Sequence, residues 1–415
     1  MLLIVVCVVV NERTIKIPPE IALLAFAFIV GVIFKVLLVT GVFTGNSIVI
    51  EDIDTFGIED VLMKAMLCFM LFSGSSDLKF KSLLSNIKSI SLLSLLTTVV
   101  TALVYGGLFY LLARLFGLDF DFALCVLLGA IVSPTDPIAA TGILNKLGLP
   151  DDITAIMEGE SLFNDGTGVA LFIFVRSIVT QSESGGFFTV MLRELVGAII
   201  VGVVVSFICS FLIRLTQNPA YHVLISLLAV SSCYVLGDKL DCSGVIASVI
   251  CGIYFATVMD KYRKAGIIKE DTDYYEAFWS TVDKIFNYVL YILIGLSFVH
   301  VVKIEHLVII IIAVIVINFI ARYVGVLASV LIMKKVPDGY SYSQFTTLMT
   351  WSGLKGGLCL ALVMSIINIV SKDQYSVMLS VVFATVLFTT VIQGLTVARL
   401  YLGLEKKVGN AAGKK

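Results

Sequence analysis

Apolar segments of about 20 residues recur along the whole chain, and this feature limits the possible folds more than any other. Of the 415 residues, 59% are hydrophobic and only 14% are charged, and the mean hydropathy is +1.04. A helix of about 20 apolar residues crosses the ~30 Å hydrocarbon core of a bilayer. The segments are continuous rather than alternating, which excludes a β-barrel. The sequence therefore predicts an all-α polytopic membrane protein in a lipid bilayer.

Thirteen segments are predicted as membrane helices. They are 1–10, 19–41, 58–75, 89–113, 122–145, 155–180, 187–213, 220–237, 243–259, 277–301, 306–333, 343–370 and 375–402. The first is too short to cross a bilayer, so either the first helix is short or the natural start lies upstream. Loops are short, so residues 1–404 are predicted to form a single transmembrane domain, followed by a short tail over 405–415.

Charge gives the predicted orientation and excludes one class of partner. Eighteen of the 29 lysines and arginines lie on one side of this topology, seven on the other and four within the spans. The richer side is expected to be cytoplasmic, which places the C-terminus inside a cell-membrane protein. The net charge of −1 argues against nucleic acid as a partner. The eight cysteines and three histidines show no metal-ligand spacing, so no cofactor is expected.

Asp165 is the most informative single residue, because it lies within the apolar span 155–180. An ionisable group in a spanning helix costs at least ~2.5 kcal/mol on insertion scales, so function is its default explanation. At about 100° per residue, Ser161 and Asp165 lie on one helix face, and Glu160 and Asn164 form a second pair beside them. Oxygen ligands around a titratable carboxylate suit a hard cation or a proton.

The span 122–145 is expected to be interrupted at Ser133-Pro134-Thr135-Asp136-Pro137. Each proline removes a backbone donor and disfavours helix at the residue before it. Freed backbone groups in a membrane require a polar or wet surrounding. Asp136 and the Thr135 carbonyl therefore join Ser161 and Asp165 as a predicted ion site. The alternative is a simple proline kink with a capping aspartate.

A second interruption is expected in the span 343–370, at Ser352-Gly353-Leu354-Lys355-Gly356-Gly357. Three glycines weaken the helix there. Lys355 must find a carboxylate, reach water or lose its proton; the alternative is that it extends to the membrane surface. The two interrupted spans are seven apart and so run in opposite directions. Such a pair in two inverted halves is typical of a secondary transporter.

Arg322 is the other charge deep in a span, and it cannot realistically lose its proton. A buried arginine needs a carboxylate or several carbonyls, and Glu160 is a plausible partner. A structural brace is favoured over direct contact with an ion.

With these motifs in place, the chain resembles the NhaP-type sodium/proton antiporters, the monovalent cation/proton antiporters related to the eukaryotic sodium/proton exchangers. The resemblance covers nearly the whole chain in order. It rests on Thr135-Asp136-Pro137, on the segment from Glu160 to Asp165, on Arg322 and on Gly353-Leu354-Lys355-Gly356-Gly357, with support from 243–247, Phe278-Trp279, Asn287 and Gly295-Leu296.

The resemblance implies a thirteen-helix inverted-repeat fold with two interrupted crossing helices. It implies a six-helix core over about 89–180 and 306–402, dimerisation helices over about 1–75 and 187–301, and a homodimer. It also implies that Asp136, Ser161, Asp165 and the Thr135 carbonyl bind Na⁺. Glu160 and Asn164 would organise this site and Arg322 would brace it. Lys355, counted among the organising residues, stands where the family usually has arginine.

The functional expectation is antiport of Na⁺ (or Li⁺) against H⁺, by competition of cation and proton at Asp165, in the service of ion and pH homeostasis. Because Asn164 rather than a second aspartate precedes Asp165, one proton per cation and electroneutral transport are expected. A potassium/proton antiporter of the same fold remains an alternative. A cation channel is less favoured because no filter loop is present. An enzyme is not expected, because no nucleophile and histidine pair is present.

Overall fold

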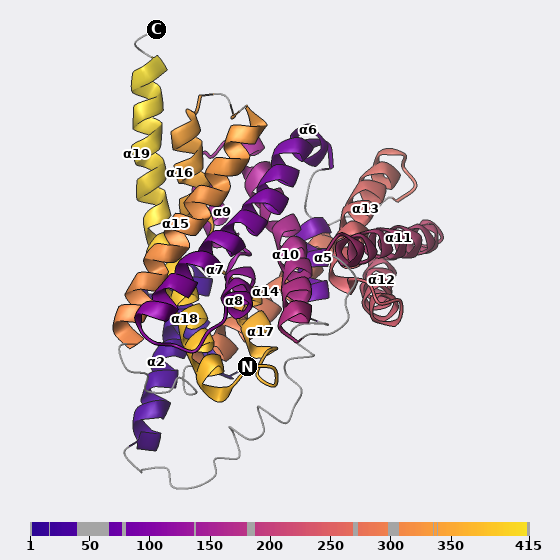
Figure 1. The fold of residues 1–415 in the computed structure, drawn as a ribbon. Helices are drawn as coiled ribbons and strands as arrows, with labels where there is room; N and C mark the ends of the chain where they lie inside the picture. Colours follow the sequence, from indigo (N-terminus) through magenta and orange to yellow (C-terminus); the bar gives the residue numbers. More distant parts are fainter. Residues whose placement is uncertain are drawn as a thin grey trace. The chain divides into compact units, whose positions relative to one another are not determined.

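The computed structural model describes residues 2–15, 17–39, 66–76, 80–136, 138–180, 187–268, 273–297, 307–334, 336–337 and 339–412. Every regular element in these ranges is a helix (Figure 1). The chain forms two compact units. The first comprises residues 1–48, 86–182 and 289–415, and the second comprises 49–85 and 183–288. The predicted division into a core and a dimerisation part stays a prediction.

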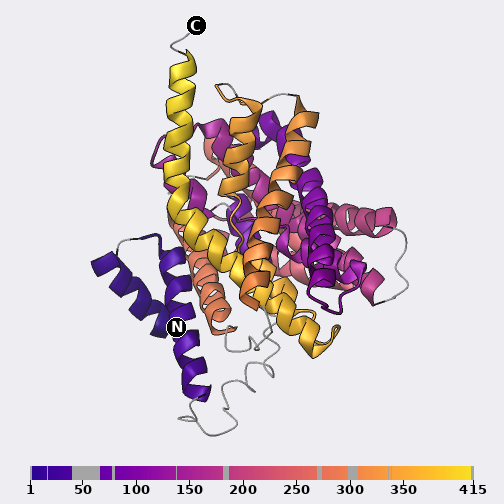
Figure 2. The ribbon, with the colours of Figure 1, turned by 60° about the vertical axis from the view of Figure 1, so that its left-hand side comes forward.

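The first unit contains both predicted interruptions. Its helices are α1 (Leu2–Val10), α2 (Pro19–Val39), α7 (Thr97–Leu115), α8 (Phe122–Val132), α9 (Ile138–Asn145), α10 (Asp151–Val179), α15 (Leu307–Met333), α16 (Tyr342–Ser352), α17 (Gly357–Met364), α18 (Lys372–Phe388) and α19 (Gly394–Ala412). Three π-helical turns adjoin these helices: η1 (Asn11–Ile15), η3 (Leu92–Leu96) and η5 (Thr389–Gln393). Figure 2 shows the chain changing direction between α18 and α19, where η5 lies.

The second unit contains α5 (Leu67–Ser76), α11 (Phe187–Arg214), α12 (Pro219–Lys239) and α13 (Gly244–Lys264), while α6 (Phe80–Ser91) and α14 (Asp273–Ser297) run across the unit boundaries. Trp279 is fully buried in it. Its ring lies 4.6 Å from that of Phe72, and its Nε1 donates to Ser226 Oγ at 3.1 Å. An indole with a satisfied N–H is a stable core residue, and here it joins α5, α12 and α14.

Seven of the described helices are long and apolar enough to cross a membrane. An eighth is counted if α16 and α17, which meet at 57°, form one bent span. The predicted spans 187–213, 220–237 and 243–259 coincide with α11, α12 and α13 to within a few residues. Of the span 58–75, residues 58–65 lie outside the described part of the chain. The total of thirteen spans therefore stays a prediction.

Short polar residues set the starts of several helices. The Asp121 carboxylate accepts from Leu124 N at 2.6 Å at the start of α8, and Ser243 Oγ accepts from Ile246 N at 3.2 Å at the start of α13. Ser341 and Ser371 each form a reciprocal capping box, the first with Gln344. Such caps satisfy amide groups that have no partner within the helix, so these starts are encoded locally.

Candidate functional site

The first interruption lies where the prolines predict it. α8 ends at Val132, α9 begins at Ile138, and the described residues between them, 133–136, are not helical. Pro137 lies outside the described residues. α10 packs closely on this break, because a Cβ added at Gly168 would lie only 2.4 Å from Pro134 Cγ. Glycine at this position therefore lets α10 and the broken segment touch.

Asn164 joins α10 to the extended segment. Its Nδ2 donates to Thr135 Oγ1 at 2.7 Å and to Glu160 Oε1 at 2.9 Å, while its Oδ1 accepts from Thr135 N at 3.3 Å. Ser161 Oγ donates to the Thr135 carbonyl at 2.6 Å. Thr135, Glu160, Ser161 and Asn164 are all buried. The predicted ligands Thr135 and Ser161 are thus adjacent. Asn164 satisfies the Thr135 N–H and Ser161 satisfies the Thr135 carbonyl, two backbone groups that the break exposes.

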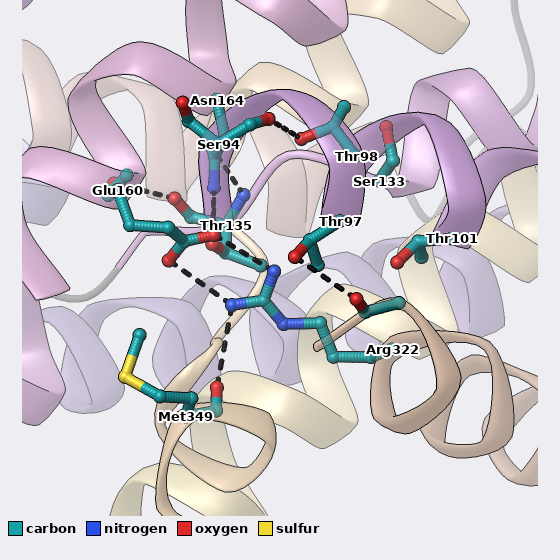
Figure 3. A network of polar contacts seen from close by, with 12 residues as sticks. Ser94, Thr97, Thr98, Thr101, Ser133, Thr135, Glu160, Asn164, Arg322 and Met349 are labelled. Carbon is teal, nitrogen blue, oxygen red and sulfur yellow. Dashed lines mark hydrogen bonds and ion pairs between the residues drawn. The ribbon is translucent and has the colours of Figure 1, made fainter. Parts of the chain in front are cut away.

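Glu160 and Arg322 form the ion pair that the sequence made plausible. Arg322 Nη1 lies 2.9 Å from Glu160 Oε1 and Nη2 lies 3.2 Å from Oε2, with both side chains 3% exposed. This two-point contact is the strong geometry for arginine and carboxylate. Nη2 also donates to the Met349 carbonyl at 3.4 Å. Figure 3 shows the guanidinium between Glu160 and Met349, so it connects α10, α15 and α16.

Close packing holds the helix of Arg322 against α7. A Cβ added at Gly325 would lie 2.5 Å from Thr101 Oγ1 and 2.8 Å from the Thr97 carbonyl. Nearby, Thr97 Oγ1 and Ser329 Oγ lie 2.8 Å apart. Figure 3 shows Thr97 and Thr101 on one side of the Arg322 side chain. Small residues permit such close approach of membrane helices, and they fix the helix that carries the arginine.

The second interruption also lies where the glycines predict it. α16 ends at Ser352 and α17 begins at Gly357. Gly353 lies against the guanidinium, since an added Cβ would meet Arg322 Nε at 2.9 Å. Lys355 is 1% exposed, and its Nζ donates to the Ser133 carbonyl at 3.1 Å. From the sequence, this lysine is expected to find a carboxylate, reach water or lose its proton. The acceptor of the Lys355 ammonium is thus a backbone carbonyl freed by the first break, and not a carboxylate.

The two interruptions contact each other directly. Besides the bond from Lys355 to Ser133, the Asp136 N–H donates to the Leu354 carbonyl at 2.8 Å. A Cβ added at Gly356 would lie 2.8 Å from Asp136 Cβ. Backbone groups that lost their helical partners in one break are therefore satisfied by the other, which is how irregular backbone is tolerated at membrane depth.

Asp165 lies on α10 one turn after Ser161 and is half-buried. The charged groups that act on it are Asp136, Glu160 and Lys355. Glu160 is neutralised by Arg322, whereas the Asp165 side chain forms no hydrogen bond or ion pair within the described residues. Asp165 is thus a carboxylate whose oxygens are not committed to a protein partner in this part of the chain.

All eight residues predicted for the site are therefore brought together in the first unit. The arrangement offers carboxylate, hydroxyl and carbonyl oxygens, which are the ligands that hard cations prefer. The described residues contain no cluster of three or more histidine, cysteine or acidic side chains of the kind that holds a resident metal. Sequence reasoning missed the carbonyls of Ser133 and Met349, because side-chain patterns carry no signal for backbone acceptors.

Comparison with known proteins gives a consistent result. The family model described as "Sodium/hydrogen exchanger, transmembrane" matches residues 1–403. The Na(+)/H(+) antiporter NhaP of Pseudomonas aeruginosa is 30% identical, with 96% of each chain covered. The Na(+)/H(+) antiporter NhaH of Halobacillus dabanensis is 28% identical over 99% of this chain and 96% of its own.

Among solved structures, the sodium proton antiporter MjNhaP1 from Methanocaldococcus jannaschii at pH 8 aligns with a TM-score of 0.78. The two chains are 20% identical, and 97% of each is covered. This similarity concerns the fold alone. The family match over almost the entire length, together with the relative at 30% identity, shows that the chain belongs to the transmembrane sodium/hydrogen exchanger family.

Proposed function

We propose that this chain exchanges Na⁺ for H⁺ across the cell membrane by competition of the two ions at Asp165. One observation carries the proposal: Asp165 lies within electrostatic reach of Asp136 in the first interruption and Lys355 in the second, and its carboxylate is not used by a protein partner within the described residues. Membership of the family supports cation/proton antiport, and the names of the relatives favour sodium. Li⁺ is proposed as a further substrate.

The proposed cation ligands are Asp165, Asp136, Ser161 and the Thr135 carbonyl. When the proton concentration is low, Asp165 is ionised and binds the cation with the other oxygens. When the proton concentration is high, the Asp165 carboxylate is protonated and the cation leaves. An unpaired carboxylate in a low dielectric is strongly disfavoured, so only the loaded site crosses easily. This condition couples the two fluxes.

The surrounding residues are proposed to hold these ligands in place. Glu160 is committed to Arg322 and Asn164 to Thr135, so neither competes for the cation. Lys355 holds the Ser133 carbonyl next to the ligand segment. The amide of Asn164 cannot titrate in the physiological range. One proton per cation, and hence electroneutral exchange, follows from this composition.

The finer architecture belongs to the same proposal. We infer thirteen membrane helices in two inverted repeats, a six-helix core that moves against dimerisation helices, a homodimer and a cytoplasmic C-terminus. The pair of interrupted helices in contact supports this inference, because such pairs lie at the repeat interface of transporters. Cross-linking in native membranes tests the dimer, and protease access to a C-terminal tag in right-side-out vesicles tests the orientation.

The direct test uses purified protein in liposomes with a pH-sensitive dye inside. An outward proton gradient should drive saturable uptake of Na⁺ and Li⁺ by the wild type, and the Asp165→Asn variant should show none. Asp119→Asn, in an exposed loop after α7, is the matched control and should retain exchange. Exchange by Asp165→Asn would move the site elsewhere. A preference for K⁺ would replace sodium as the substrate, and unsaturable flux without proton coupling would indicate a channel.

A further inference from the structure

Two neighbouring threonines contact the second interruption from outside it. Lys355 N donates to Thr389 Oγ1 at 3.1 Å, and Thr390 Oγ1 donates to the Lys355 carbonyl at 3.2 Å. All three residues are 1% exposed. Both backbone groups of Lys355 are thus satisfied by side chains of another segment. In a break that lies in a membrane helix, these groups have neither helical partners nor bulk water.

The two threonines lie where the helix departs from regular α geometry. Consecutive residues of a regular α-helix point about 100° apart and do not share a face. Thr389 and Thr390 begin the π-helical turn η5, where the chain bends between α18 and α19 (Figure 2). Single π-helical turns occur frequently at functional sites. From this turn the two hydroxyls contact different backbone groups of the same residue, the N–H and the carbonyl of Lys355.

The direction of each hydrogen bond is also defined. Thr389 Oγ1 donates its hydrogen to the Val386 carbonyl at 3.1 Å, which leaves a lone pair to accept from the Lys355 N–H. Thr390 Oγ1 uses its hydrogen on the Lys355 carbonyl. The two hydroxyls therefore play different roles, one as acceptor and one as donor, and together they match the donor and the acceptor of a single peptide residue.

The position of the Lys355 backbone also affects the first interruption, because Lys355 and its neighbour are hydrogen-bonded to it. Its side chain holds the Ser133 carbonyl, and the carbonyl of its neighbour Leu354 accepts from Asp136 N. Moving the Lys355 backbone would therefore displace both ends of the segment from Ser133 to Asp136, which contains two of the proposed cation ligands. No sequence motif marked the threonines, and none of the site residues predicted from sequence lies on η5.

We propose that Thr389 and Thr390 are positioning residues for the antiport reaction: they fix the backbone of Lys355 and through it the geometry of the cation ligands Thr135 and Asp136. The inference rests on the proposed function of that site. Neither threonine touches the cation. By holding the Lys355 backbone, the two threonines preserve the contacts between the second interruption and the first.

The test measures exchange in proteoliposomes as a function of Na⁺ concentration and pH for Thr389→Val and Thr390→Val. Valine keeps the shape and removes the hydroxyl. Each variant should need about two- to tenfold more Na⁺ for half-maximal exchange, the factor expected for one lost hydrogen bond. Thr389→Ser and Thr390→Ser, which keep the hydroxyl, should remain near the wild type. A structural role alone would lower the amount of active protein without this change in Na⁺ requirement.

Thr385→Val is the matched control. Thr385 is fully buried one turn earlier on α18, and its hydroxyl donates to the Val381 carbonyl of its own helix at 2.8 Å. This control should keep the wild-type Na⁺ requirement. If either valine variant fails to accumulate, the Ala and Ser variants at that position are compared instead, because they differ only by the hydroxyl.

Two results would overturn the inference while leaving the antiport proposal intact. In the first, the wild type exchanges but Thr389→Val and Thr390→Val match Thr385→Val. In the second, the serine variants lose as much affinity as the valine or alanine variants. By contrast, a wild type without cation-coupled proton flux would refute the proposed function itself, so the two failures are distinguishable.

Discussion

The ion pair of Glu160 and Arg322 allows a quantitative test of how the site is built. The substitution Glu160→Gln keeps the shape of the side chain and an acceptor for Asn164, but it leaves the Arg322 charge without its counter-ion. Two charge-assisted hydrogen bonds, at 2.9 and 3.2 Å, lose their ionic partner. At about 1.5–3 kcal/mol each, their loss agrees with the ~3–5 kcal/mol typical of breaking a buried pair.

A double-mutant cycle separates the pair from its two members. Arg322→Gln alone should also destabilise the protein, because it strands the Glu160 carboxylate. The double variant Glu160→Gln/Arg322→Gln buries no unpaired charge, so its loss should fall short of the sum of the single losses by roughly 2–3 kcal/mol. Loss of stability by the single variants would reflect the uncompensated charge and not the worth of the pair, since a buried ion pair often contributes little by itself.

The assay is denaturant-induced unfolding in detergent micelles, followed by the fluorescence of the two tryptophans. Asp119→Asn, an exposed carboxylate, provides the control and should leave the midpoint unchanged. Strictly additive single losses, or a loss below about 1 kcal/mol for Glu160→Gln, would refute this account of the pair. In liposomes, Glu160→Gln should also raise the Na⁺ concentration for half-maximal exchange, because it removes a negative neighbour of Asp165 and exposes that site to an unneutralised guanidinium.

Three further outcomes are expected. Gly353→Ala should lower exchange because its Cβ would meet Arg322 Nε at 2.9 Å, whereas Gly107→Ala, with open space around it, should have no such effect; equal liposome exchange rates would contradict this. Burial, followed by the charge of Glu194, raises the pKa of Cys242. At pH 7 the reactive thiolate should therefore be scarcer than for an ordinary thiol, so maleimide labelling of a variant that keeps only Cys242 should be slower than labelling of an exposed thiol and should accelerate as the pH rises; labelling as fast as that of an exposed thiol would be inconsistent with it. Wild-type exchange should carry no net charge, so a transport current in liposomes with symmetric ions would rule out one proton per cation.

Both helix breaks could be predicted from the sequence because their causes are local. The prolines around Thr135 remove donors from their own helix, and the glycines on either side of Lys355 relax theirs. The structure ends α8 at Val132 and α16 at Ser352, directly before these motifs. Similarly, α12 and α13 begin within one residue of their predicted spans, because a capping residue, Asn218 or Ser243, directly precedes each continuous apolar segment.

The hydrogen-bond and ion-pair partners of the site residues could be predicted only where a buried charge restricts which groups can pair with it. Arg322 needed a buried carboxylate, and Glu160 was available at a suitable depth. Lys355 had the same need, yet it donates to the Ser133 carbonyl. A helix break turns a backbone carbonyl into a strong acceptor, and a residue-based pattern does not contain that information. The chain-wide count of spans likewise depends on tertiary arrangement and on residues beyond those described.

The π-helical turns show a further reason why sequence patterns were insufficient. Nothing in the composition of Thr389–Gln393 or Leu92–Leu96 separates these turns from the helices around them. The contact of η5 is a peptide group more than 30 residues away in sequence, which local composition does not encode. Only the folded structure shows why two threonines occur side by side in an otherwise apolar helix.

The direction of the Ser161 hydroxyl hydrogen determines whether its oxygen can contact a cation or an anion. Because that hydrogen points at the Thr135 carbonyl, the oxygen presents only lone pairs to anything else that approaches. A chloride ion would find no donor there, while an alkali cation would find a negative dipole end. At this one oxygen, the orientation of the O–H bond therefore favours contact with a positive ion over contact with a negative one.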